Sequence, residues 1–165
     1  MPPRSQPYTA LAVVAGFLSS LAAGLFLVFL APALRLSKID YPYLLGQLEV
    51  PEGKLSVMLG WLLFLLGGVL WALFYAHYLH NHLPGPGWLQ GLTYGGIGIF
   101  LLSSVVVFPL MGLHPWVEAG KLAAPGFFAF GLSGWKAVFT TFLGHCLYGI
   151  LLGRIYRRHL IFSSS

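Results

Sequence analysis

Charged side chains are almost absent from four long apolar stretches of this chain. The stretches are residues 8–33, 55–79, 88–112 and 137–155. The 165 residues contain nine Lys and Arg and four Asp and Glu, but within the stretches only Arg154, near the end of the last one, is charged. Because charge is costly in hydrocarbon, this exclusion indicates that the chain folds in a lipid bilayer.

Length and composition agree with helices that span a membrane. A hydrocarbon core of roughly 30 Å needs about 20 apolar residues, and each stretch provides about that number. The chain has 58% hydrophobic and 8% charged residues, whereas about a quarter of the residues in soluble domains are charged. We predict an all-α membrane protein: a four-transmembrane-helix bundle in which residues 1–165 form a single polytopic membrane domain. The run after Arg4 exceeds the roughly 7–15 residues of a cleavable signal, so we expect it to remain as the first span.

The connections between the stretches differ in length. Residues 34–54 and 113–136 form two long outer connections, and residues 81–87 form a short turn rich in Pro and Gly. Residues 39–50 are expected to contain a short surface helix. Residues 125–135 are too apolar for open solvent and too short to span, so we expect the second connection to lie partly in the membrane interface.

The arginines lie mainly on one predicted side of the membrane. Four spans place both termini and the short turn together, with Arg4, Arg154, Arg157 and Arg158 and no acidic residue. The other side mixes five Lys and Arg with all four acids. The positive-inside rule therefore predicts cytoplasmic termini. Anionic lipid headgroups account for the arginines, and no nucleic-acid partner is expected.

Small residues at helical spacing mark the expected contacts between spans, because they let helix backbones approach closely in lipid. The candidates are Gly16, Ser20 and Gly24 in the first stretch, Gly91 and Gly95 in the third, Gly149 and Gly153 in the fourth, and Gly60 and Gly67, a heptad apart, in the second. Such stripes predict a compact bundle without a wide lumen, which disfavours a channel or a roomy carrier.

Six histidines are the residues that point most directly to a metal or a haem. His77, His80, His82 and His159 are expected on the side of the termini, where imidazoles are candidate metal ligands. No Cys or carboxylate accompanies them there. A haem between His77 and His145 is disfavoured, because the two are expected to differ in depth by about 18 Å. We therefore expect no cofactor, with haem or metal kept as an alternative.

His145 is the titratable side chain predicted well inside the bilayer. Ionisable groups at that depth are candidates for function, and Tyr148, about one turn later, is the second candidate for a ligand site. Structural hydrogen bonding across the bundle is the alternative role. No Asp or Glu accompanies His145, and Ser103 and Ser104 lack an acid for a triad. No catalytic residue and no enzyme activity are expected.

Three segments together resemble a known group of proteins. They are residues 71–75 with the Leu83-Pro-Gly-Pro86 turn, residues 91–112 ending in Phe-Pro-Leu-Met-Gly, and Gly144-His-Cys-Leu-Tyr-Gly-Ile-Leu-Leu-Gly153. They resemble an uncharacterised family of small bacterial four-span integral membrane proteins, in which a Gly-His-x-x-Tyr-Gly-x-x-x-Gly pattern opens the last helix. The resemblance implies the four-helix fold and no activity. We expect the bacterial inner (cytoplasmic) membrane.

Three functions remain open. The first is a non-catalytic accessory or structural subunit of a larger membrane complex of respiratory or photosynthetic type, with partner subunits in the membrane. The second is a small carrier or a lipid- or small-molecule-binding membrane protein that uses His145 and Tyr148. The third is a haem- or metal-binding electron-transfer subunit.

Overall fold

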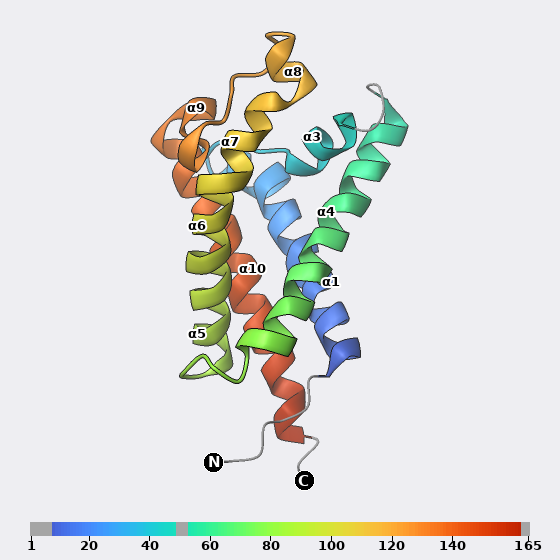
Figure 1. Ribbon diagram of the computed structural model, residues 1–165, viewed down its shortest axis with the longest axis vertical. Coiled ribbons are helices and arrows are strands. Elements are labelled where there is room, and N and C mark those ends of the chain that lie inside the picture. Colours follow the sequence, from blue (N-terminus) through green and yellow to red (C-terminus); the bar gives the residue numbers. More distant parts are fainter. Residues whose placement is uncertain (1–7, 49–52, 163–165) are drawn as a thin grey trace.

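Long helical segments run along the molecule (Figure 1). The computed structural model describes residues 8–48 and 53–162, with side chains as far as Arg157. In this part, four segments are long and apolar enough to cross a membrane, namely Thr9–Ala33, Lys54–Leu79, Gly87–Leu113 and Trp135–Arg157. The predicted all-α four-helix membrane fold is confirmed, and the predicted span ends differ from these bounds by two residues at most.

Each of the first three spans combines α-helix with wider π-helical turns. The first contains α1 (Thr9–Leu25), a π segment (Phe26–Leu30) and α2 (Ala31–Ala33); the second contains α4 (Lys54–Phe74) and a π segment (Tyr75–Leu79). The third contains α5 (Gly87–Gly91), a π segment (Leu92–Ile99), α6 (Phe100–Leu102), a π segment (Ser103–Val107), α7 (Phe108–Leu110) and a 3₁₀ turn (Met111–Leu113). The fourth is the continuous helix α10 (Trp135–Phe162). π-Helical turns are rare in proteins.

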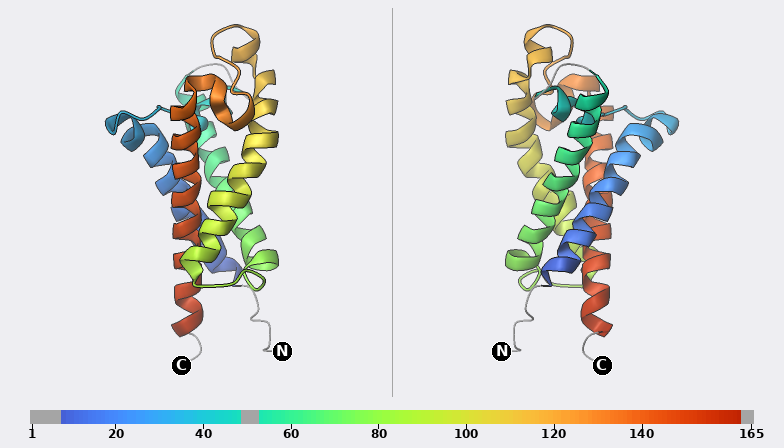
Figure 2. Two further views of the ribbon diagram at one scale, coloured as in Figure 1. Left: turned by 90° about the vertical axis from the view of Figure 1, so that its left-hand side faces the viewer. Right: turned by 90° about the vertical axis from the view of Figure 1, so that its right-hand side faces the viewer.

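The long connections lie together at one end of the bundle, and the start of α1 and the end of α10 lie at the other (Figures 1 and 2). The first connection contains α3 (Tyr41–Gln47), and the second contains α8 (Pro115–Glu118), a 3₁₀ turn (Phe127–Ala129) and α9 (Phe130–Ser133). We call the end with α3, α8 and α9 the outer end. The helix expected within residues 39–50 is therefore present. It packs against α4 and buries Tyr41 and Leu44, so it is part of the bundle rather than a surface helix. Glu49 and Val50 lie outside the described residues.

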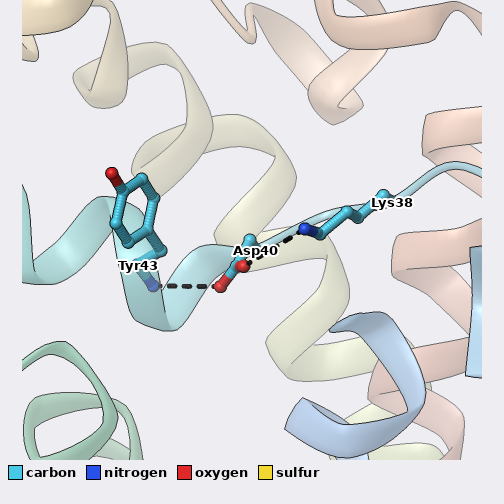
Figure 3. A network of polar contacts seen from close by, with 3 residues as sticks. All are labelled: Lys38, Asp40 and Tyr43. Atoms are coloured by element: carbon cyan, nitrogen blue, oxygen red, sulfur yellow. Dashed lines mark hydrogen bonds and ion pairs between the residues drawn. The ribbon is translucent and has the colours of Figure 1, made fainter. Parts of the chain in front are cut away.

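The start of α3 is fixed by a side chain (Figure 3). Asp40 is the N-cap residue, and its Oδ1 accepts a hydrogen bond of 3.1 Å from the backbone N–H of Tyr43. Its Oδ2 lies 3.8 Å from Nζ of Lys38, an exposed side chain. The cap satisfies one of the backbone donors that a helix start leaves without a partner.

The main contacts between the spans run in the order second, first, fourth, third. Helix α1 packs against both α4 and α10, and α10 packs against α5 and the π segment that follows it. Glycines allow these close approaches. A Cβ on Gly16 would lie 2.6 Å from the Cβ of Ala72 on α4, and a Cβ on Gly95 would lie 2.6 Å from the Cα of Gly149 on α10.

The other small residues expected between helices also lie at contacts. Ser20 faces Gly68, Gly24 faces Trp61, and Gly153 approaches the carbonyl of Gly87. The hydroxyl of Ser20 donates a hydrogen bond of 2.8 Å to the carbonyl oxygen of Gly16 on its own helix. These contacts close the bundle along two lines, α1 with α4 and α5 with α10.

Two expectations about glycines are wrong. A Cβ on Gly67 would meet nothing within 4 Å, and Gly60 faces α3 at the carbonyl of Pro42 rather than another span. Gly68 takes the predicted role of Gly67 and faces Ser20. Adjacent residues of an α-helix point about 100° apart around its axis, so Gly67 is turned away from this contact. The Gly144–Gly153 pattern also does not open the last helix. Helix α10 begins at Trp135, so the pattern lies within it.

Tyrosines fill the half of the bundle nearer the termini. Tyr75, Tyr94, Tyr148 and Tyr156 are all buried. The ring centroids of Tyr75 and Tyr94 lie 5.2 Å apart, and those of Tyr75 and Tyr156 lie 5.9 Å apart. The hydroxyl of Tyr94 donates a hydrogen bond of 2.7 Å to the carbonyl oxygen of Trp71, close to where the π segment of the second span begins. Large side chains with bonded hydroxyls therefore occupy this part of the interior.

Candidate functional site

His145 lies on α10 and faces the third span. Its Nδ1 lies 2.9 Å from the carbonyl oxygen of Thr141, and its Nε2 lies 3.4 Å from Oγ of Ser103. A carbonyl oxygen only accepts hydrogen bonds, so Nδ1 carries the proton and donates to Thr141. In the neutral ring, Nε2 is then the acceptor, and the hydroxyl of Ser103 is the donor. His145 thus links two spans inside the bilayer, as the structural alternative for this residue requires.

An aromatic ring of the third span, that of Phe100, packs against His145. The centroid of the Phe100 ring lies 5.7 Å from that of His145 and 5.2 Å from that of Phe142. Phe100 is buried, and its ring also lies 5.9 Å from Phe128 of the second outer connection. Phe100 is therefore in contact with His145 on one side and with the outer segment on another.

Tyr148 does not share the hydrogen bonds of His145. Its hydroxyl donates a hydrogen bond of 2.7 Å to the carbonyl oxygen of Gly68 on α4, whereas His145 bonds to Ser103 on the third span. The two polar groups thus bond to different helices. This geometry does not favour a ligand site in which His145 and Tyr148 act together.

Sequence reasoning missed a series of buried polar groups near the outer end. The hydroxyl oxygens of Tyr41 and Thr141 lie 3.4 Å apart, and Oγ1 of Thr140 accepts a hydrogen bond of 3.3 Å from the backbone N–H of Ser37. Burial raises the pKa of Tyr41, and the hydrogen bond with Thr141 opposes this effect. The hydroxyl of Ser104 is buried and has no hydrogen-bond partner among the described residues. The only sequence signal for these buried polar groups was the presence of isolated hydroxyl residues within the apolar stretches.

The histidines near the termini do not form a common site in the described part of the chain. Nδ1 of His77 lies 2.9 Å from the carbonyl oxygen of Leu73, and Nδ1 of His82 lies 2.8 Å from that of Tyr78. Among the described residues, no group of three or more His, Cys, Asp and Glu is placed to hold a metal ion. The side chains of His159 and Arg158 and all of Arg4 lie outside the described residues.

His80 differs from its neighbours because its ring packs inside the bundle. The ring lies between Tyr75 and Tyr156, with centroids 5.7 Å and 4.9 Å away, and its Nδ1 is buried without a partner among the described residues. Burial lowers the pKa of His80, and the positive charge of Arg157 lowers it further. Arg157 also donates a hydrogen bond to the carbonyl oxygen of Gly85, which fixes the short turn against α10.

An open apolar groove of about 740 Å³ lies near the outer end, between the second outer connection and the third and fourth spans. We call it the aromatic groove. Its side-chain lining is Phe100, Phe127, Phe128, Phe130, Trp135 and Val138. No charged side chain lines it, so it offers shape and apolar contact and no ionic partner.

Comparison with characterised proteins gives no match, and comparison with solved structures gives none. A family model described as a family of unknown function, DUF6789, matches residues 8–160. The match includes all four spans, both outer connections, His145 and the aromatic groove. It is also compatible with the four-span family that the sequence resembles. The chain therefore belongs to DUF6789, a family of unknown function.

Proposed function

We propose that this integral membrane protein is non-catalytic and serves as an accessory subunit of a larger membrane complex of respiratory or photosynthetic type. The observation that best supports the proposal is the closed interior of the bundle. Glycine contacts bring α1 against α4 and α5 against α10, and tyrosines fill the half nearer the termini. Because the interior is filled, the surface of the bundle is the part that is available to interact with other molecules.

The outer end provides the apolar surface expected for contact with a partner. Phe127 is 63% exposed, Trp135 is 77% exposed and Leu113 is 73% exposed. These fractions are large for apolar residues beyond or at the ends of the spans, where water or headgroups would otherwise meet them. We expect a membrane-protein partner to cover part of this end.

Extraction from native membranes in mild detergent tests the accessory role. The full chain, tagged at its C-terminus, is expected to migrate with other membrane subunits of reproducible identity. The variant Trp135→Glu is expected to weaken this association at least tenfold. The variant Trp88→Glu, at a 43% exposed tryptophan near the opposite end, is the matched control. Recovery of the native protein only as a partner-free monomer would contradict the proposal.

We also propose that the membrane is a bacterial inner membrane and that both termini are cytoplasmic. Support comes from Arg154 and Arg157 near the end of α10, where the positive-inside rule acts most strongly. Cysteine labelling tests the orientation. In a Cys146→Ala background, Lys121→Cys is expected to react with a membrane-impermeant maleimide in intact spheroplasts, and His82→Cys only after lysis. Both parent residues are exposed, so the reverse pattern would show the opposite orientation.

We propose further that the protein has no resident haem or metal. The support is that these histidines lie apart and already have hydrogen-bond partners. His77 and His82 bond to carbonyls of their own segment, and His145 bonds to Thr141 and Ser103. Protein purified from its native host is expected to show no Soret band and no stoichiometric transition metal by elemental analysis. Either signal would overturn this part of the proposal and favour electron transfer.

A further inference from the structure

We propose that the aromatic groove binds a hydrocarbon chain of a membrane lipid. This inference does not require the accessory role, because a bound lipid requires no partner protein. Phe127 and Trp135 belong both to the groove and to the surface proposed for a partner, so the test below changes Val138 instead. It assigns the groove a ligand class, an acyl or isoprenoid chain. It rests on the position of the groove, on the backbone that forms its wall, and on the chemistry and size of its lining.

The deep part of the groove lies where hydrocarbon is the surrounding medium. Phe100 belongs to the span Gly87–Leu113 and Val138 to the span Trp135–Arg157, and both line the groove. The turn Phe127–Ala129 packs beside the π segment Ser103–Val107 and beside α7, so the wall it forms reaches down along the third span. Figure 1 shows this segment and α9 next to α7. The molecules that reach such a groove from the outside are lipids.

The outer wall of the groove has an unusual backbone. Phe128 has φ 59° and Ala129 has φ 60°, both in the left-handed region that L-residues with side chains seldom adopt. Residues persist in that region only where the surrounding structure fixes them, and such positions cluster at ligand sites. Here the backbone N–H of Gly131 donates a hydrogen bond of 2.8 Å to the carbonyl oxygen of Pro125, which closes the segment into a compact loop. The wall is therefore formed before any ligand arrives.

Gly131 allows the two ends of this loop to meet. A Cβ on Gly131 would overlap the carbonyl oxygen of Ala124, so the two ends of the loop touch through backbone atoms. The result is a loop that turns the rings of Phe127, Phe128 and Phe130 toward the groove that they line.

The lining favours a chain rather than a headgroup or a protein helix. The side chains are phenylalanines, one valine and one tryptophan, which leave a phosphate or an amine without an ionic partner. The volume of about 740 Å³ is in the range of small-molecule sites. On α10 the lining extends only from Trp135 to Val138, about 4.5 Å along the helix axis, whereas a packed helix is about 10–12 Å in diameter. A narrow flexible chain fits this shape better than a helix from a partner.

The site also gives the lipid a defined depth. Trp135 is the first residue of α10 and is 77% exposed, a position typical of the aromatic residues that lie at headgroup level. Phe100 is deeper and in contact with His145. A chain that enters beside Trp135 and ends against Phe100 would leave its headgroup at the interface, where no specific headgroup is required.

Filling the groove tests the inference. In the full chain, Val138→Trp places a large side chain in the groove, whereas Phe139→Trp changes the neighbouring residue, which is 53% exposed and does not line the groove. Each protein is purified in detergent and incubated with palmitoyl-oleoyl phosphatidylglycerol, palmitoyl-oleoyl phosphatidylethanolamine or dihexanoyl phosphatidylglycerol. Retained lipid is counted by native mass spectrometry, and thermal unfolding verifies that both variants are folded.

The wild type and Phe139→Trp are expected to retain both long-chain lipids and to lose the short-chain lipid. Val138→Trp is expected to retain at least tenfold less long-chain lipid. Equal retention by Val138→Trp and Phe139→Trp would overturn the inference, because it would indicate lipid bound elsewhere on the spans. Retention that depends on the headgroup rather than on the chain length would overturn it as well. So would a result in which Val138→Trp loses a bound protein partner or a second copy of this chain while lipid is never detected on the wild type.

Discussion

The backbones of Gly91 and Gly149 are in direct contact. A Cβ on Gly91 would overlap the carbonyl oxygen of Gly149, and a Cβ on Gly149 would overlap the carbonyl oxygen of Gly91. The relationship is reciprocal, so neither helix can carry a larger residue here without separating from the other. Lipid provides no hydrophobic force to bring helices together, and close van der Waals contact of this kind is a main source of their association.

We expect Gly149→Ala to destabilise the bundle by about 1–3 kcal/mol, the usual effect of overpacking. The matched control is Gly67→Ala, also a helical glycine, whose new Cβ would meet nothing within 4 Å. This control should be neutral or gain up to about 1 kcal/mol from helix propensity. Unfolding midpoints in a bilayer-like detergent mixture measure both effects. Equal stability of the two variants would show that the α5–α10 contact does not hold the helices together.

Double-mutant cycles distinguish the two uses proposed for His145. We expect His145→Phe and Ser103→Ala to be coupled by about 0.6 kcal/mol, the typical value for a hydrogen bond between membrane helices. His145→Phe and Tyr148→Phe should be coupled more weakly than this, because the two side chains, three residues apart on α10, bond to different helices. The exposed Tyr78→Phe is the control for the loss of a tyrosine hydroxyl. Strong coupling between His145 and Tyr148 would instead support the hypothesis of a ligand site that the two residues share.

The sequence predicts the spans well because charge exclusion and length are properties of each segment alone. From spacing it predicts that Gly16 lies at a helix contact, but it does not identify α4 as the partner. It also cannot separate Gly67 from Gly68, since that choice depends on which side of the helix meets its neighbour. The aromatic groove was not predictable either. Phe100 and Phe128 are far apart in the chain and meet only through a loop whose left-handed residues, Phe128 and Ala129, have no sequence signature.

At the start of α3, the contribution of the Asp40 hydrogen bond to stability can be measured separately from the contribution of its charge (Figure 3). Asp40→Ala removes the acceptor for the N–H of Tyr43 and is expected to cost about 1 kcal/mol of stability. Asp40→Asn keeps an acceptor and removes only the ion pair with Lys38, an exposed residue, so most of the stability should remain. Lys38→Met should resemble Asp40→Asn. If Asp40→Asn is as damaging as Asp40→Ala, the carboxylate acts through its charge and the cap is secondary.

His80 is expected to make stability depend on pH. Burial lowers its pKa below the ordinary value of 6.5, and the charge of Arg157 adds to the effect. The unfolded chain therefore binds a proton at a higher pH than the folded chain does. The stabilising contribution of neutral His80 is complete above pH 6.5 and is lost as the pH falls from that value through the lower pKa of the folded protein.

Thermal unfolding of the full chain in detergent, measured at steps of falling pH, tests this dependence. The wild-type midpoint is expected to fall below pH 6.5, and His80→Gln should flatten this part of the profile because glutamine does not titrate. Arg157→Gln should reduce the slope, since one of the two causes of the lowered pKa is removed. His82→Gln, at an exposed ring near the same end of the bundle, is the control and should keep the wild-type slope. A slope that survives in His80→Gln would assign the pH dependence to another group, because in the folded protein the packing of His80 between Tyr75 and Tyr156 is the feature that opposes its protonation.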